Sequence, residues 1–82
     1  MCRNITTLRG LEPPATPEEI SAAALQYVRK VSGIQSVSAA TQSAVDEAVA
    51  EVAAVTTRLL ESLPPRRQPP TKEPPLRRLA RR

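Results

Sequence analysis

The chain has no histidine, phenylalanine or tryptophan, and it contains one tyrosine and one cysteine. Without histidine it lacks the commonest general base and a common zinc ligand, and a single cysteine cannot form an intramolecular disulfide. A core without large aromatic side chains depends on Ala, Val, Leu and Ile, which bury less surface. We therefore predict that the protein is not an enzyme, that it holds no metal or cofactor, and that it is marginally stable or self-associated as a homodimer.

Long apolar runs are also missing. No charged start is followed by the apolar stretch of a signal peptide, and no run approaches the roughly eighteen apolar residues of a membrane span. With one cysteine and no export signal, the sequence predicts a cytoplasmic protein without a transmembrane segment.

Charge divides the chain near Leu63. Residues 1–63 carry five Lys and Arg against seven Asp and Glu, whereas residues 64–82 carry seven against one. The positive charge of the whole chain thus comes from its end. We predict two parts: a small helical domain over 1–63 and a disordered, proline- and arginine-rich tail over 64–82.

The tail contains a five-residue repeat in which proline pairs begin at positions 64, 69 and 74. Proline pairs favour extended polyproline II structure, and the cations between them can contact phosphates or other anions. The tail's candidate residues for electrostatic binding are Arg66, Arg67, Lys72, Arg77, Arg78, Arg81 and Arg82. The alternative partners are nonspecific nucleic acid, an anionic membrane surface, an acidic protein and the chain's own acidic helix face, which consists of Asp46, Glu47 and Glu51. A tail that serves only as a solubilising disordered extension is a further alternative.

The clearest helix signal is Thr16-Pro17-Glu18-Glu19. Thr16 and Glu19 have the spacing of a capping box, and Pro17 suits the first helical position. Gly33 is typical of a left-handed residue just after a helix. The sequence predicts a helix over about 16–32 whose apolar stripe consists of Ile20, Ala24, Tyr27, Val28 and Val31.

A longer second helix is predicted from Ser36 or Ser38 to about Ser62, where Pro64 follows. Its apolar stripe consists of Ala48, Val52, Val55 and Leu59, widened by Val45, Val49, Leu60 and Leu63. This stripe is wider than one facing helix covers, so the excess should bury against the N-terminal segment or a second copy of the chain. The predicted fold is all-α: a short helical turn within residues 1–12, two antiparallel helices (about 16–32 and 38–62) as a hairpin or small bundle, and the tail.

Three segments resemble a bacterial family known as domain of unknown function 2277: Met1-Cys2-Arg3-Asn4-Ile5, Glu12-Pro13-Pro14-Ala15-Thr16 with Glu19-Ile20, and Gln26 to Gly33. The resemblance covers residues 1 to about 62 and leaves the tail outside. It implies a short intracellular helical protein and supplies no activity, substrate or cofactor.

Two candidate sites remain near the N-terminus. Loss of Met1 would leave Cys2 with a free amine beside its thiol, a pair that can bind metals or react with carbonyls. An incidental role is the alternative. A second candidate is an anion site formed by Arg3, Asn4, Arg29 and Lys30, if the N-terminus packs near the end of the first helix. The alternative is that Arg29 and Lys30 only complement the helix dipole.

These observations predict a small interaction module. Its helices would bind a second copy or an unknown protein partner, and its tail would add electrostatic attachment. Two alternatives are a nonspecific nucleic-acid-binding protein and a thiol or metal protein centred on Cys2.

Overall fold

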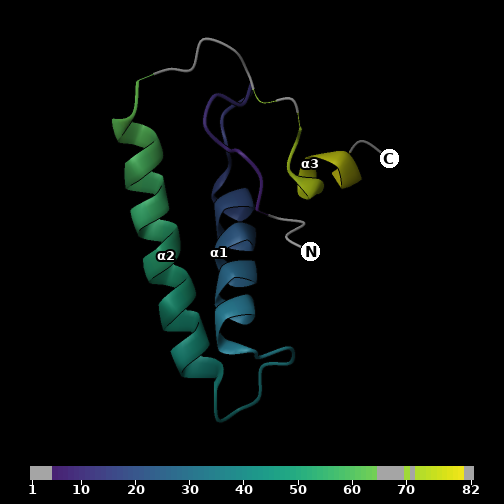
Figure 1. Ribbon diagram of the computed structural model, residues 1–82, viewed down its shortest axis with the longest axis vertical. Coiled ribbons are helices and arrows are strands. Elements are labelled where there is room, and N and C mark those ends of the chain that lie inside the picture. The colour runs from purple at the N-terminus through teal and green to yellow at the C-terminus, as the bar shows by residue number, and fades with distance from the viewer. Residues whose placement is uncertain (1–4, 65–69, 71, 81–82) are drawn as a thin grey trace.

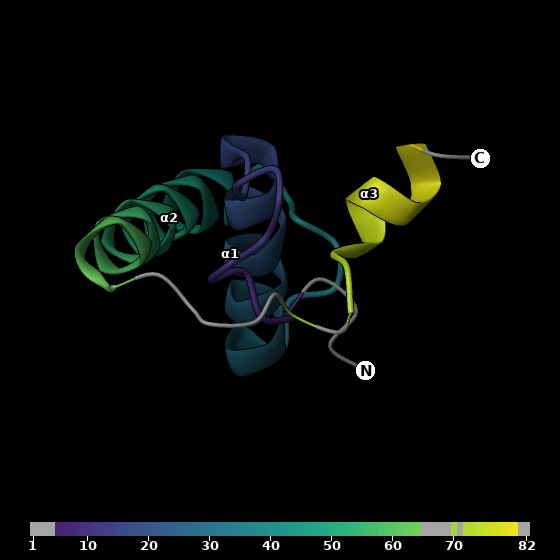
Figure 2. The same ribbon diagram turned by 90° about the horizontal axis from the view of Figure 1, so that it is seen from above.

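The computed structural model describes residues 5–64, 70 and 72–80, with the backbone alone at 78–80. These residues form three helices and no strand: α1 (Pro17–Ser32), α2 (Gln42–Ser62) and α3 (Pro75–Ala80). Helices α1 and α2 run antiparallel and pack against each other as a hairpin (Figure 1). Short helix α3 lies on the side of α1 opposite α2, as the view from above also shows (Figure 2). The predicted all-α hairpin is confirmed.

Both ends of α1 follow the predicted capping rules. The Thr16 side chain accepts a hydrogen bond from the Glu19 amide at 3.1 Å, and the Glu19 carboxylate accepts one from the Thr16 amide at 2.8 Å. At the other end, Gly33 is left-handed with φ 73°, and its amide donates to the carbonyl of Arg29 at 2.9 Å. The local sequence therefore fixes where α1 begins and ends.

Helix α2 begins at Gln42, later than the predicted Ser36 or Ser38. The Ser38 amide donates to the Thr41 hydroxyl at 3.0 Å, and the Thr41 amide donates to the Ser38 carbonyl at 3.1 Å. These bonds close a local turn that competes with helix formation, as serine and threonine side chains often do. The predicted start was wrong by about one helical turn.

The core lies at the N-terminal end of α1. Leu8, Leu11 and Ile20 form its buried centre, and the partly buried side chains packed against it are Ala15, Ala53 and Leu60. Ala24, Val28 and Val45 are also buried. Leu8 and Leu11 come from the N-terminal segment (residues 5–16), and Ala53 and Leu60 of α2 pack against them, so this segment covers part of α2, as one of the two predicted alternatives proposed.

The N-terminal segment is not helical. Its described residues 5–12 contain bends and a turn at Arg9 and Gly10, where Gly10 has φ 87°. The predicted helical turn in this region was wrong. β-Branched Thr6 and Thr7 disfavour a helix, and the irregular path still places Leu8 and Leu11 in the core.

Part of the predicted apolar stripes is exposed. Four side chains of these stripes are about half exposed or more: Tyr27 and Val31 of α1, and Val55 and Leu59 of α2. Val31 is the most exposed of the four, at 67%. The N-terminal segment packs near Ile20 and leaves the C-terminal half of α1 with α2 as its main neighbour. An apolar stripe is buried only where a second element reaches it, which explains the difference.

Candidate functional site

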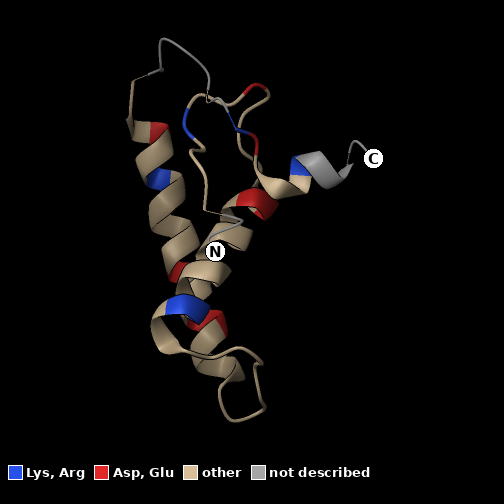
Figure 3. Cartoon of the chain, turned by 45° about the vertical axis from the view of Figure 1, so that its right-hand side comes forward, with Lys and Arg blue, Asp and Glu red and all other residues tan. Residues whose placement is uncertain are grey.

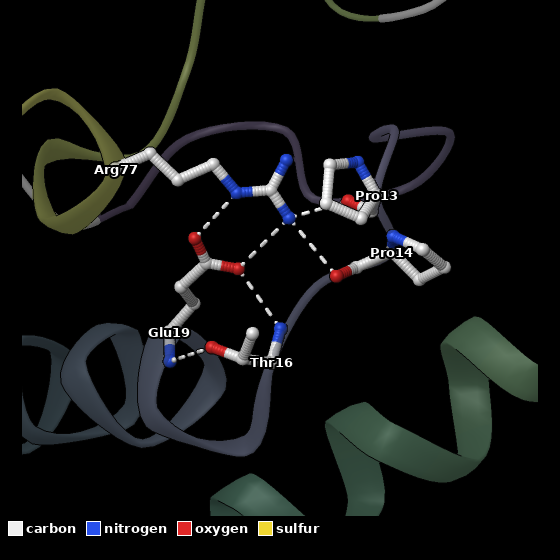
Figure 4. A network of polar contacts seen from close by, with 5 residues as sticks. All are labelled: Pro13, Pro14, Thr16, Glu19 and Arg77. Atoms are coloured by element: carbon white, nitrogen blue, oxygen red, sulfur yellow. Dashed lines mark hydrogen bonds and ion pairs between the residues drawn. The ribbon is translucent and has the colours of Figure 1, made fainter. Parts of the chain in front are cut away.

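Arg77 of α3 inserts its guanidinium group into a set of oxygen acceptors at the start of α1 (Figure 4). Its Nε donates to Oε2 of Glu19 at 2.7 Å, and Nη2 donates to Oε1 of the same carboxylate at 3.2 Å. Nη2 also donates to the carbonyl of Pro14 at 2.9 Å and to the carbonyl of Pro13. The carboxylate is thus engaged by two guanidinium nitrogens, the geometry that suits arginine and not lysine.

Glu19 is the centre of this arrangement. The residue is 4% exposed, and the Arg77 side chain is 14% exposed. Burial alone would raise the pKa of Glu19, but the hydrogen bonds from Arg77 and from the Thr16 amide, with the charge of Arg77, lower the pKa below its ordinary value. The carboxylate therefore stays ionised inside the fold, as a buried charge does when it is paired and hydrogen-bonded.

A second arginine ties the N-terminal segment to the end of α2. Arg9 donates from Nε at 3.1 Å and from Nη2 at 2.6 Å to the carbonyl of Pro64. Two arginines thus connect three segments that are distant in sequence: residues 9–19, the end of α2 and α3. Sequence reasoning gave Arg9 no role.

The predicted anion site is not assembled among the described residues. Arg29 and Lys30 are exposed in the last turn of α1, where they complement the helix dipole. Arg3 and Asn4 lie outside the described residues, as does Cys2. Figure 3 shows the described Lys and Arg residues distributed over α1, α2 and the chain's two end segments. The anion site and the reactive thiol stay predictions.

The basic tail differs from its prediction over its last part. Residues Pro75–Ala80 form α3 instead of a disordered chain, and Arg77 is bound to the folded body. Lys72 is exposed, and Arg78 lies in α3, where only its backbone is described. Arg66, Arg67, Arg81 and Arg82 lie outside the described residues.

The ion pair described for the tail, between Arg77 and Glu19, also involves a different acid from those predicted from the sequence. The exposed acids Asp46, Glu47 and Glu51 of α2 were the candidates, whereas Arg77 binds Glu19. Asp46 accepts a hydrogen bond from the side chain of Gln42 at 2.7 Å. Glu19 was recognised as a capping residue only. The available signal was that a capping box uses one carboxylate oxygen and leaves the second free for another donor.

Another feature is a shallow hollow on the exposed side of α2. It is lined by Glu51, Val52, Ala54, Val55 and Arg58. Leu59 follows Val55 by one helical turn and is 55% exposed, and Val55 is 52% exposed. Val52, Val55 and Leu59 therefore form an apolar strip on α2, and the Glu51 carboxylate and the Arg58 guanidinium border it.

The described residues contain no group of three His, Cys, Asp or Glu residues arranged to hold a metal ion. None of their helices combines the length and apolar character needed to cross a membrane.

Comparison with known proteins gives one match. The family model of an uncharacterised conserved protein, DUF2277, matches residues 1–82. The match includes the tail, which corrects the expectation that the resemblance ends near residue 62. Neither the curated proteins nor the solved structures contain a match to this chain.

Proposed function

The chain belongs to the DUF2277 family, and from this premise we propose that it is a self-associating helical interaction module in which α2 binds a second copy of the chain. The observation that carries the proposal is the apolar strip of Val52, Val55 and Leu59, in which Val52 is partly buried and Val55 and Leu59 are exposed. Exposed apolar side chains at one-turn spacing on a helix are typical of a surface that another helix covers.

Charge complementarity supports a second copy of the chain as the partner. Glu51 and Arg58 are both exposed, and they border the hollow two helical turns apart, about 10 Å along the axis. In an antiparallel pair of α2 helices related by a two-fold axis near Ala54 and Val55, Glu51 of each copy faces Arg58 of the other. A two-fold interface repeats every favourable pair, so one strip supplies two ion pairs.

The same register matches the apolar side chains. The axis places Val55 of one copy within one residue of the level of Val55 of the other, and it brings Leu59 of one copy within two residues, about 3 Å along the axis, of the level of Val52 of the other. The contact between the two Val55 side chains lies between the two ion pairs. This order, an apolar centre with charges at the rim, is typical of protein interfaces.

Sedimentation of the full chain over a wide concentration range tests the proposal. We expect a reversible monomer–dimer equilibrium. Arg58→Glu should weaken it at least roughly tenfold because two carboxylates then face each other. The double variant Glu51→Arg/Arg58→Glu should restore dimerisation, since the pairs re-form with their signs exchanged.

Lys30→Glu is the matched control, because it makes the same charge change at an exposed residue of α1. It should leave the equilibrium unchanged. A monomer at all concentrations, or a double variant as weak as Arg58→Glu alone, would contradict the proposed interface.

The basic tail adds electrostatic attachment in this proposal, and a cytoplasmic location stays the prediction made from the sequence. A dimer carries two copies of the positively charged segment, which raises its avidity for an anionic surface. Titration of the labelled chain with a short DNA duplex at low and moderate salt measures this attachment. Chemical-shift changes confined to the tail and lost with added salt are expected. Salt-resistant changes at Arg29 and Lys30 would instead favour the anion site predicted from sequence.

A further inference from the structure

The acceptor set around Arg77 is built entirely from residues 13–19. Among the described residues, the Glu19 carboxylate and the carbonyls of Pro13 and Pro14 supply the acceptors for this guanidinium group. The donor comes from α3, nearly sixty residues later in the chain. Acceptor and donor are therefore two separate pieces of chain that meet only in the tertiary structure.

The acceptor set is held in place without Arg77. The Thr16 amide binds Oε1 of Glu19, and the Thr16 hydroxyl binds the Glu19 amide, so the capping box fixes both the backbone and the carboxylate. Pro13 and Pro14 have restricted backbones, which limits the movement of their carbonyls. A site whose groups are already oriented loses little conformational entropy when a ligand binds.

The segment that supplies the donor, Pro74 to Arg77, resembles a bound peptide ligand. Helix α3 has six residues, too few to be stable as an isolated helix in water. Its position therefore depends on contacts with the body, and the described ones are made by Arg77; Pro74, which precedes α3, is also buried. Leu76 between them is exposed. The segment therefore combines a buried Pro74 with a hydrogen-bonded Arg77, and the sequence pattern that contains both is a proline pair, one residue of any type and an arginine.

We propose that residues 13–19 form a binding site for proline-rich peptide segments of the form Pro-Pro-X-Arg, and that the chain's own Pro74–Arg77 occupies this site as a resident ligand. The same spacing occurs at Pro64-Pro65-Arg66-Arg67, so the tail holds two copies of the motif and one site. A segment from another chain competes with the resident one. The proposal does not depend on self-association through α2.

Competition has a quantitative consequence. The resident segment is tethered to its site, so its effective concentration is high, in the millimolar range for a short flexible connection. A free peptide of the same sequence should therefore bind the wild-type chain weakly. It should bind tightly enough to measure once the resident arginine is removed.

The test uses a fluorescent peptide with the sequence of residues 72–80, Lys-Glu-Pro-Pro-Leu-Arg-Arg-Leu-Ala, and full-length protein. The Arg77→Ala variant should bind it at least roughly tenfold more tightly than the wild type, as measured by anisotropy. Adding Glu19→Gln to that variant should lower the affinity at least roughly tenfold, because the charged, doubly bonded acceptor is lost. Equal binding to all three proteins would overturn the proposal.

Three control peptides separate recognition from charge. A peptide with alanine at the position of Arg77 should lose binding, whereas one with alanine at the position of Arg78 should keep most of it. A scrambled peptide of the same composition measures plain attraction to the acidic body. If the scrambled peptide binds as well as the original, the site does not recognise the motif.

A second measurement covers the case in which Arg77→Ala does not fold, which circular dichroism reveals. In ¹⁵N-labelled wild-type protein, the Nε–H signal of Arg77 reports its bond to Glu19. Excess unlabelled peptide should move that signal to the position of a solvent-exposed arginine. A signal that does not move at saturating peptide would show that Arg77 is a permanent structural contact, and would refute the proposed exchange.

Discussion

The two ends of α1 have similarly strong capping signals in the sequence, but they lie in different environments in the structure. At the first turn, Glu19 and Ile20 are buried beneath the N-terminal segment and Arg77. At the last turn, Arg29, Lys30 and Val31 are exposed, although Gly33 caps the helix as predicted. Caps position a helix end, but tertiary neighbours decide whether that end contributes to the core. The contrast can be tested by matched substitutions at the two ends.

The largest difference is expected between two branched aliphatic residues of the same helix. Ile20→Ala should lower the free energy of unfolding by about 3 kcal/mol, because it removes buried methyl groups and leaves a cavity beside Leu8 and Leu11. Val31→Ala should change it by less than about 0.5 kcal/mol, since Val31 is exposed. Urea unfolding followed by circular dichroism measures both. Similar losses at the two positions would mean that the C-terminal end of α1 is also covered, for example in a dimer.

The next effect concerns the two acids of the first turn. Glu19→Ala should destabilise the fold by about 2 kcal/mol, because it removes the return bond of the capping box and leaves the Arg77 guanidinium without its carboxylate. Glu18→Ala, at the exposed neighbour, should cost no more than about 0.5 kcal/mol from the helix dipole. Thermal unfolding compares the two. A Glu19→Ala protein as stable as Glu18→Ala would show that the buried pair adds no net stability.

A smaller loss is expected at the other end of the helix. Gly33→Ala should cost about 1 kcal/mol because a side chain disfavours the left-handed backbone at φ 73°. An added methyl group there meets no atom within 4 Å, so steric overlap with neighbours contributes nothing. Gly33→Asn should lose less, since asparagine tolerates this conformation better. If both variants unfold like the wild type, the left-handed cap is not required.

The smallest effect is a pH dependence at the first turn. The pKa of Glu19 is lower in the folded chain than its ordinary value, so the unfolded chain binds this proton more readily. The stabilisation is complete above the unfolded pKa of about 4.3 and is lost as the pH falls through the lower folded value. The stability difference between wild type and Glu19→Gln should therefore shrink as the pH is lowered from 7 to 3. A constant difference over this range would contradict the role given to ionised Glu19.

Arg77→Ala should reduce the same pH dependence, because the hydrogen bonds and charge of Arg77 are among the causes that lower the pKa of Glu19. It leaves the Thr16 bonds to Glu19 in place. Comparing the two variants separates the contribution of the tail from that of the capping box.

Local patterns predicted much of the fold and little of the candidate site. Thr16, Pro17 and Gly33 identified α1 because capping depends on residues within one turn of each other. The start of α2 was missed because Ser38 and Thr41 can bond to each other or cap a helix, and sequence does not choose between these. Arg77 and Glu19 were missed as partners, since nothing in their own neighbourhoods links them.

The sequence by itself determined α1 and most of α2, their antiparallel order, the absence of a large aromatic core and the concentration of positive charge after Leu63. These properties depend on composition and on contacts between residues close in the chain. Only the tertiary structure decided that Leu8 and Leu11 complete the core, that Val55 and Leu59 stay exposed, and that Arg77 brings part of the tail onto α1. Each of these depends on which segments, distant in the sequence, contact each other in the fold. Neither segment alone determines the burial of a side chain or the pairing of a charge.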